Sequence, residues 1–323
     1  MTIDLNSVIH SYNPYHCIFR DGFVFTPVTE PANIFDAIVI RSPENCDCWS
    51  PKKSFSTHSL KEHIDFINKH RLEKAVIIAE DLRFLKECPT LKYIEIIPAD
   101  TASDHFDYSP LSYLPEVCYL SCTTRYGGAD EPYSTSIDYS TVHGIKDLFV
   151  NGQGHLNYNT VNTLETLEVY GDKNNRDLLY LSECTNLKSL GFSYCGLNTF
   201  SGINSLKSIE KVSVFNCRTL QDISELCKVA SSLKTLSIES CAKLSDFSWL
   251  SELNNLEHLY LWGNNELPNL HFLKSMKKLK TFTFSMKILD NDLTPCLDIP
   301  YVCCAKNRKE YNLKDKDLPK NLK

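Results

Sequence analysis

The chain repeats one short pattern at a nearly constant interval, and this repetition constrains its fold more than any other feature. Six segments carry apolar residues at their first, fourth and sixth positions, and they begin at Leu164, Leu187, Ile209, Leu233, Leu256 and Leu279. Their starting points are 23, 22, 24, 23 and 23 residues apart. A period of about 20 to 30 residues predicts units that stack into a solenoid, because one such unit cannot bury its own apolar face.

The second half of each segment has the period of a β-strand. Apolar residues at positions four and six alternate with more polar ones, so the apolar side chains point into the core and their neighbours line an open sheet face. Each unit completes one circuit before the next strand begins, so neighbouring strands must be parallel.

Four of the six segments carry a further mark, a Cys or Asn eight residues after the first apolar residue. These residues are Cys195, Cys217, Cys241 and Asn264. An apolar residue follows two or three places later. The full pattern, L-x-x-L-x-L-x-x-N/C-x-L, resembles that of leucine-rich repeat proteins.

This resemblance implies an α/β solenoid, a leucine-rich repeat horseshoe with a parallel concave β-sheet and short helices or 3₁₀ turns on the convex side. Segments such as Asp222–Leu226 and Asp246–Leu250 supply the short turns, with Asp or Ser as N-caps. They look most similar to bacterial repeats of the internalin type.

Weaker copies of the pattern extend the array in both directions. They begin at Leu72, Leu91, Leu114, Ile145 and Ile299. The copy at Leu114 directs Val117 and Tyr119 inward and Leu120 onto the open face. An insert at Thr123–Tyr133 lengthens the next interval to 31 residues. Inserts in repeat proteins often mark the binding face, and a tolerated surface excursion is the alternative.

The sequence divides into three regions. Residues 1–57 form an N-terminal capping subdomain, with a hairpin signal at Asp21-Gly22 and a strand from Ile34 to Arg41. Residues 58–305 form the solenoid. Residues 306–323 form a basic C-terminal tail with seven Lys or Arg against three Asp or Glu, which we expect to be solvated and disordered.

The solenoid opens with an amphipathic helix over Ser59–His70. Ser59 is its expected cap, and the inward residues are Leu60, Ile64, Phe66 and Ile67.

Composition favours a cytoplasmic protein. The sequence contains no run of 18 apolar residues and no signal-peptide pattern, so we expect no membrane association. Fourteen cysteines in such a chain favour a reducing compartment. The net charge is −6 and no basic stripe is present, so we expect no nucleic-acid partner.

The sequence contains few motifs of the kinds that bind metals or catalyse reactions. Cys46 and Cys48 are the best metal candidates, with His58 or His63 as partners. A lone Cys-x-Cys lacks the paired spacing of structural zinc sites, so we predict no metal and no cofactor. G-x-S-x-G, H-E-x-x-H, Walker A and dinucleotide-binding patterns are absent, which predicts that the protein is not an enzyme.

The open sheet face is the expected binding surface, because it combines aromatic side chains with carboxylates. Exposed aromatic residues often supply binding energy at interfaces, and carboxylates attract basic partners. Strand propensity is the alternative explanation for Tyr and Phe, but it explains a Trp on an open strand less well. The predicted partner-binding residues are Tyr93, Glu95, Phe149, Glu168, Tyr170, Phe215, Glu239, His258, Tyr260 and Trp262.

We therefore predict a monomeric protein-protein interaction module that binds a basic protein partner. A bacterial immunity protein that masks a basic toxin is one concrete form of this hypothesis. A secreted effector that targets host proteins is the alternative. An enzyme built on Cys46, Cys48 and nearby histidines is a third hypothesis, which bound metal would support.

Overall fold

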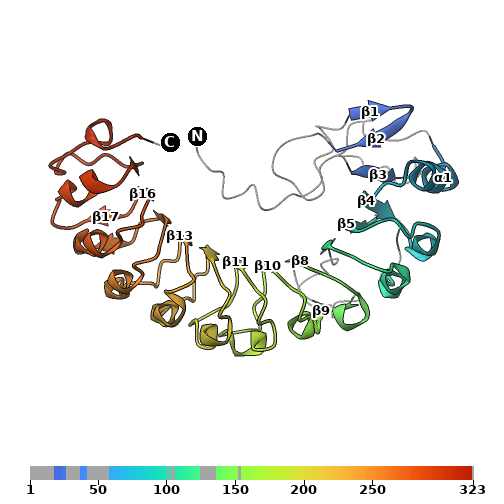
Figure 1. Ribbon diagram of the computed structural model, residues 1–323, viewed down its shortest axis with the longest axis horizontal. Coiled ribbons are helices and arrows are strands. Elements are labelled where there is room, and N and C mark those ends of the chain that lie inside the picture. The colour runs from blue at the N-terminus through green and yellow to red at the C-terminus, as the bar shows by residue number, and fades with distance from the viewer. Residues whose placement is uncertain are drawn as a thin grey trace. The chain divides into compact units, whose positions relative to one another are not determined.

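The computed structural model describes residues 18–26, 37–41, 58–99, 102, 106–123, 136–151 and 154–321. The chain divides into two compact units, Met1–Thr163 and Leu164–Lys323. In each unit short parallel strands alternate with 3₁₀ turns, which lie on the side away from the strands (Figure 1). The predicted region boundaries at residues 57 and 305 remain predictions, since this division does not test them.

The first unit begins with a hairpin and continues as a parallel sheet. β1 (Ile18–Arg20) and β2 (Phe23–Phe25) are antiparallel, and Asp21 and Gly22 turn between them with φ of 50° and 79°. The sheet order is then β3 (Ile38–Arg41), β4 (Lys74–Ala79), β5 (Tyr93–Pro98), β6 (Tyr119–Thr123) and β8 (Asp147–Asn151). Two short strands, β7 (Ile137–Asp138) and β9 (His155–Leu156), pair separately. The 3₁₀ helices are Arg83–Glu87, Ser109–Tyr113, Tyr139–Thr141 and Tyr158–Thr160.

The predicted helix is present as α1 (Leu60–His70). Ser59 caps it through a capping box, in which the Ser59 side chain accepts from the Glu62 N–H and the Glu62 carboxylate accepts from the Ser59 N–H. The predicted inward face is wrong at one position, because Leu60 is 41% exposed. His63 is buried instead, one turn further along, where its Nδ1 lies 2.8 Å from the Ser59 carbonyl oxygen.

The register predicted for the repeat at Leu114 is also wrong. β6 pairs with β5 so that Ile94 lies opposite Leu120 and Ile96 lies opposite Cys122. Leu120 is therefore fully buried, and Ser121 takes the open-face position. Val117 occupies the first apolar position of this repeat, three residues later than predicted. The alternation of apolar residues does not choose between the two registers, because each register places apolar side chains in the core.

The second unit contains seven consecutive parallel strands. They are β10 (Thr166–Tyr170), β11 (Ser189–Ser193), β12 (Lys211–Phe215), β13 (Thr235–Glu239), β14 (His258–Trp262), β16 (Thr281–Phe284) and β18 (Tyr301–Cys304). β15 (Glu266–Leu267) and β17 (Lys287–Ile288) form a second ladder. The fourth residue of each repeat lies in one fully buried row: Leu167, Leu190, Val212, Leu236, Leu259, Phe282 and Val302.

The predicted Asp N-caps are wrong by one position, because the N-cap residues of these two 3₁₀ helices are Ile223 and Phe247, which follow Asp222 and Asp246. The carboxylates of Asp222 and Asp246 each accept a 2.8 Å hydrogen bond from the N–H two residues later, at Ser224 and Ser248. The 3₁₀ helices are Leu179–Leu181, Ile203–Ser205, Ser224–Val229, Ser248–Glu252, His271–Ser275, Thr294–Asp298 and Asp315–Asp317. Short 3₁₀ turns fit here because each repeat is only about 23 residues long.

Buried cysteines occupy the turn after three strands. Cys195 donates to the Val169 carbonyl oxygen at 3.3 Å, and Cys217 donates to that of Phe192 at 3.6 Å. In the next repeat the predicted residue, Asn264, is exposed. Asn265 replaces it, since its side chain donates to the carbonyl oxygens of Cys241 and Leu244 at 3.0 and 2.7 Å.

The predicted basic tail is ordered over residues 306–321 and covers the outer edge of β18. The Val302 N–H donates to the Pro319 carbonyl oxygen at 2.9 Å, and Tyr301 bridges to Lys320. Tyr311 is 3% exposed, and its hydroxyl accepts from the Ile288 N–H at 3.0 Å. The expectation of a solvated, disordered tail is therefore wrong for this segment, because these contacts satisfy backbone groups of an edge strand.

Candidate functional site

The open sheet face of the second unit carries a row of large side chains at the carboxyl ends of its strands. Strand pairing places Tyr170, Ser193, Phe215, Glu239 and Trp262 in register across β10–β14. Each of the five is partly exposed. Four of them belong to the predicted site, so the structure brings these four together.

Tyr194 joins this row, although it is not among the predicted site residues. Its ring centroid lies 5.1 Å from that of Tyr170 and 5.1 Å from that of Phe215, with interplanar angles of 53° and 80°. Offset and edge-on contacts of this kind are favourable for aromatic rings. Tyr170, Tyr194 and Phe215 therefore form one cluster, called here the aromatic cluster.

Strand alternation could not reveal Tyr194, because this residue lies one place beyond β11. Its φ is 56°, and the equivalent residues Asn216 and Ser240 also have positive φ. An aromatic residue is unusual where neighbouring repeats place Asn, Ser or Gly. That contrast is the sequence signal that could have identified it.

Glu168 lies in the middle of the open face, over Gly191 of the next strand. The two residues are in register, and a Cβ added to Gly191 would lie 1.6 Å from Glu168 Oε2. The Glu168 side chain therefore needs a glycine at that position. Its Oε1 is buried and has no hydrogen-bond partner within the described part of the chain.

Burial determines the electrostatics of this face. Burial raises the pKa of Glu168 to about 7. The attraction to the Lys211 ammonium lowers the same pKa, but by less. Burial also raises the pKa of Glu239 and lowers that of His258. The Glu168 carboxylate is thus poorly solvated and the Glu239 carboxylate is partly desolvated, so a cation placed beside them would supply stabilisation that water does not.

Three lysines next to these strands, besides Lys211, form ion pairs with glutamates. Lys188 contacts Glu165 at 2.5 Å, and Lys234 contacts Glu210 at 2.8 Å, each pair linking adjacent repeats. Lys280 and Glu257 form a third such pair. These exposed pairs contribute little stability, but each lysine charge is already matched by a carboxylate.

His258 and Tyr260 lie on β14, as predicted, but Tyr260 is not available for contact. It is 7% exposed and lies in register between Ser237 and Thr283, whose small side chains leave room for the ring. The prediction that Tyr260 is an exposed anchor is therefore wrong. His258 is partly exposed, with Nδ1 buried and unpaired among the described residues.

The register of the paired strands identifies the fold. Each repeat contributes one parallel strand with the same inward residues, joined by short 3₁₀ turns to the next. This chain has the leucine-rich repeat fold. Comparison of its sequence with protein-family models and with curated proteins found no significant match.

Several solved structures are similar to this leucine-rich repeat chain. Internalin C2 of Listeria monocytogenes is 24% identical, with a TM-score of 0.40 over 49% of this chain and 67% of its own. The internalin InlF of the same species is 14% identical, with a TM-score of 0.39 over 78% and 85%. InlJ of this species, whose functional domain includes a cysteine ladder, is 15% identical, with a TM-score of 0.26 over 70% and 64%.

The remaining predicted site residues, Tyr93, Glu95 and Phe149, belong to the first leucine-rich repeat unit. Tyr93 and Phe149 are partly exposed, and the Lys74 ammonium lies 5.7 Å from the centre of the Tyr93 ring. Glu95 is only 3% exposed, so it offers little surface to a partner. Their roles in binding stay predictions.

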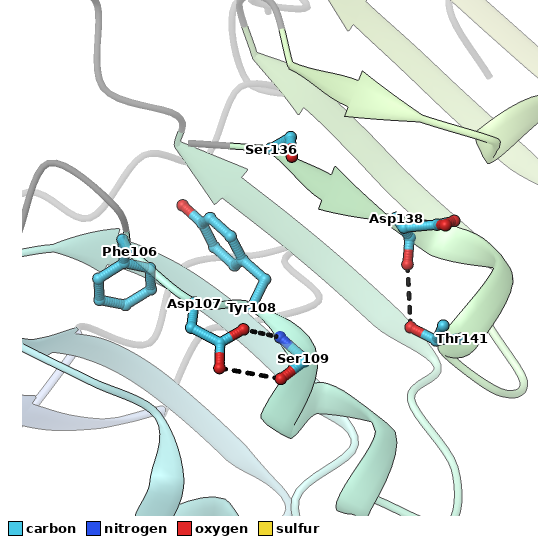
Figure 2. A pocket seen from close by; sticks show the side chains of 7 residues that line it. All are labelled: Phe106, Asp107, Tyr108, Ser109, Ser136, Asp138 and Thr141. Atoms are coloured by element: carbon cyan, nitrogen blue, oxygen red, sulfur yellow. Dashed lines mark hydrogen bonds between the residues drawn. The ribbon is translucent and has the colours of Figure 1, made fainter. Parts of the chain in front are cut away.

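The first unit also contains a surface hollow of about 360 Å³ beside two 3₁₀ helices (Figure 2). Asp107 and Asp138 line it, but both carboxylates are engaged locally. Asp107 accepts from the Ser109 N–H and hydroxyl at 2.9 Å each, and Asp138 accepts from the Ser140 N–H at 2.9 Å. Both carboxylates therefore stabilise the start of a 3₁₀ helix.

The described ranges contain neither a cluster of metal ligands nor a membrane-spanning helix. No group of three or more His, Cys, Asp or Glu there could hold a metal ion. Cys46, Cys48 and most of the Thr123–Tyr133 insert lie outside those ranges, so the predictions about them are unchanged. No helix within the same ranges is long and apolar enough to cross a bilayer.

Proposed function

We propose that this leucine-rich repeat chain is a non-catalytic scaffold that binds a basic protein on the open sheet face of β10–β14. The supporting observation is the in-register row of Tyr170, Phe215, Glu239 and Trp262, completed by Tyr194. Aromatic side chains at such a surface bury a large area on binding.

Rigidity favours this role. The row rests on parallel strands whose backbones are paired on both sides, so its side chains lose little conformational freedom when a partner docks. The aromatic cluster is also packed against itself before binding. Less of the interaction free energy would therefore be lost to ordering these side chains on binding.

The charge of the face favours a basic partner. Glu168 and Glu239 are the carboxylates of β10–β14 that point outward, against one outward lysine, Lys211, and burial raises the pKa of both carboxyl groups. An immunity protein holding a basic toxin, or an exported effector holding a basic host protein, would each use such a face. We propose the immunity role first, because masking a toxin requires only binding.

The proposal predicts that two substitutions weaken binding strongly. Partners captured from a lysate of the native cells would be identified, and the affinity of the purified complex would be measured for the wild type, Trp262→Ala and Phe215→Ala. Each variant should lose about 10- to 100-fold in affinity, the range of interface hot spots. Tyr260→Ala is avoided, because truncating a buried ring would weaken the fold itself.

Tyr113→Ala is the matched control. Tyr113 is 54% exposed and ends the 3₁₀ helix Ser109–Tyr113, away from the strands. Its affinity should equal that of the wild type, and all variants should unfold at similar temperatures. Unchanged affinity of both the Trp262 and Phe215 variants would contradict the proposed face.

A further inference from the structure

On the open face, β11 lies between two strands that carry larger outward side chains. β11 presents only Ser189, Gly191 and Ser193 outward, the smallest set of outward side chains on β10–β14. On one side β10 presents Glu168 and Tyr170, and on the other side β12 presents Lys211 and Phe215. We call this feature the β11 trough.

One end of the β11 trough is aromatic. Tyr194 lies just beyond Ser193 and contacts both Tyr170 and Phe215. Three ring systems therefore surround the carboxyl end of β11. Ring faces attract planar cations, and they pack against the methylene groups that carry such cations.

The middle of the trough contains the Glu168 carboxyl group. It lies directly over Gly191, in a space that any larger residue at 191 would fill. Its Oε1 is buried without a hydrogen-bond partner among the described residues. Buried polar atoms are almost always paired in folded proteins, so this carboxyl oxygen requires a donor, which a water molecule or a bound ligand can supply.

We propose that the β11 trough receives an arginine side chain of the bound protein, with its guanidinium group on Glu168 and its stem against the aromatic cluster. This inference rests on the proposed function and specifies its recognition chemistry. A guanidinium group supplies two parallel N–H donors to one carboxylate and stacks on aromatic rings, whereas an ammonium group does neither.

Lys211 does not fulfil this role. It lies in register with Ser189 rather than Gly191, and its attraction to Glu168 is outweighed by burial. The unbound protein therefore holds Glu168 protonated to a considerable extent near pH 7. An arriving arginine would favour the ionised carboxylate, so binding would release a proton to solvent.

The test measures the Glu168 pKa by carbon-13 NMR in protein labelled at glutamate side-chain carboxyls. Titrations would contain N-acetyl-arginine amide, N-acetyl-lysine amide or the neutral N-acetyl-citrulline amide, all at constant ionic strength. The arginine probe should lower the Glu168 pKa by about one unit or more and shift the resonances of Tyr170 and Tyr194. Citrulline should change neither.

Two variants complete the test. Glu168→Gln keeps the side-chain shape and should weaken binding of the arginine probe at least about 10-fold, as expected for loss of a charge-assisted pair. Gly191→Ala should have a similar effect by displacing the Glu168 carboxyl group. The wild-type titration does not depend on either variant folding normally.

Three results would overturn the inference: no effect of the arginine probe, an equal effect of citrulline, or tighter binding of the lysine probe. The two proposals can fail separately. If the arginine probe has no effect but Trp262→Ala still loses the captured partner, the arginine site is wrong and the docking face is retained. If the arginine probe binds but the Trp262 and Phe215 variants keep the partner, the proposed docking face falls.

Discussion

At the scale of single residues, Glu168 shows how a binding group can work against the stability of its own fold. Burial raises its pKa from 4.5 to about 7. The folded protein therefore holds the Glu168 proton more tightly than the unfolded chain does. As pH rises from about 4.5 to about 7, the unfolded state binds fewer protons at this site, so the contribution to stability falls across that window.

This argument predicts that Glu168→Gln stabilises the free protein at alkaline pH. Glutamine does not ionise, so the variant escapes the cost of a buried carboxylate. The gain should be small at pH 5 and reach about 1–3 kcal/mol at pH 8, by the relation of about 1.4 kcal/mol per pKa unit. Urea unfolding of both proteins at the two pH values would measure it. A stability difference that does not depend on pH would contradict the burial argument.

At the scale of elements, the turn that follows each strand determines how a repeat closes. Three repeats use a buried cysteine there, and the repeat of β14 uses Asn265. Gly263, with φ of 137°, allows the chain to take one more residue before it turns inward. The side-chain amide then satisfies two carbonyl oxygens that a thiol would satisfy more weakly.

Asn265→Ala should therefore destabilise the protein by about 1–3 kcal/mol, because two carbonyl oxygens lose their donors. Asn264→Ala is the matched control from the same turn. Its side chain is exposed and accepts a hydrogen bond from the Lys306 ammonium at 3.0 Å, so a change within about 0.5 kcal/mol is expected. Thermal and urea unfolding would compare them, and equal losses would show that the turn is assigned wrongly.

At the scale of the whole molecule, each unit is a stack in which every repeat depends mainly on its neighbours. The outer edge of β18 would expose unpaired backbone groups, and residues 306–321 cover it. In such a stack, opening is expected to start at the ends. The segment therefore limits fraying of the second unit.

Tyr311→Phe tests this capping role. It removes the hydroxyl that accepts from the Ile288 N–H, while the ring remains to fill its buried site. A loss of about 1–3 kcal/mol is expected, with faster hydrogen exchange at Ile288 and along β18 than in β10–β12. Tyr113→Phe, at an exposed tyrosine, should leave exchange unchanged. Uniformly faster exchange across the unit would contradict an end-opening mechanism.

Much of the fold could be predicted from local patterns. The spacing of Leu164, Leu187 and the later repeats locates β10–β16, and Ser59 with Glu62 marks the start of α1. The candidate site was predicted only in part. Tyr170, Phe215, Glu239 and Trp262 lie together, but Tyr194 was missed and Tyr260 is buried.

The sequence alone determined the repeat period, the parallel strands and the inward rows, because a regular alternation of apolar residues leaves few ways to bury them. Only the tertiary structure decided the register of β6, the use of Asn265, the burial of Tyr260 and the packing of residues 306–321. In each case two local arrangements satisfy the same pattern. Contacts with the neighbouring repeat select one of them, and those contacts exist only after stacking.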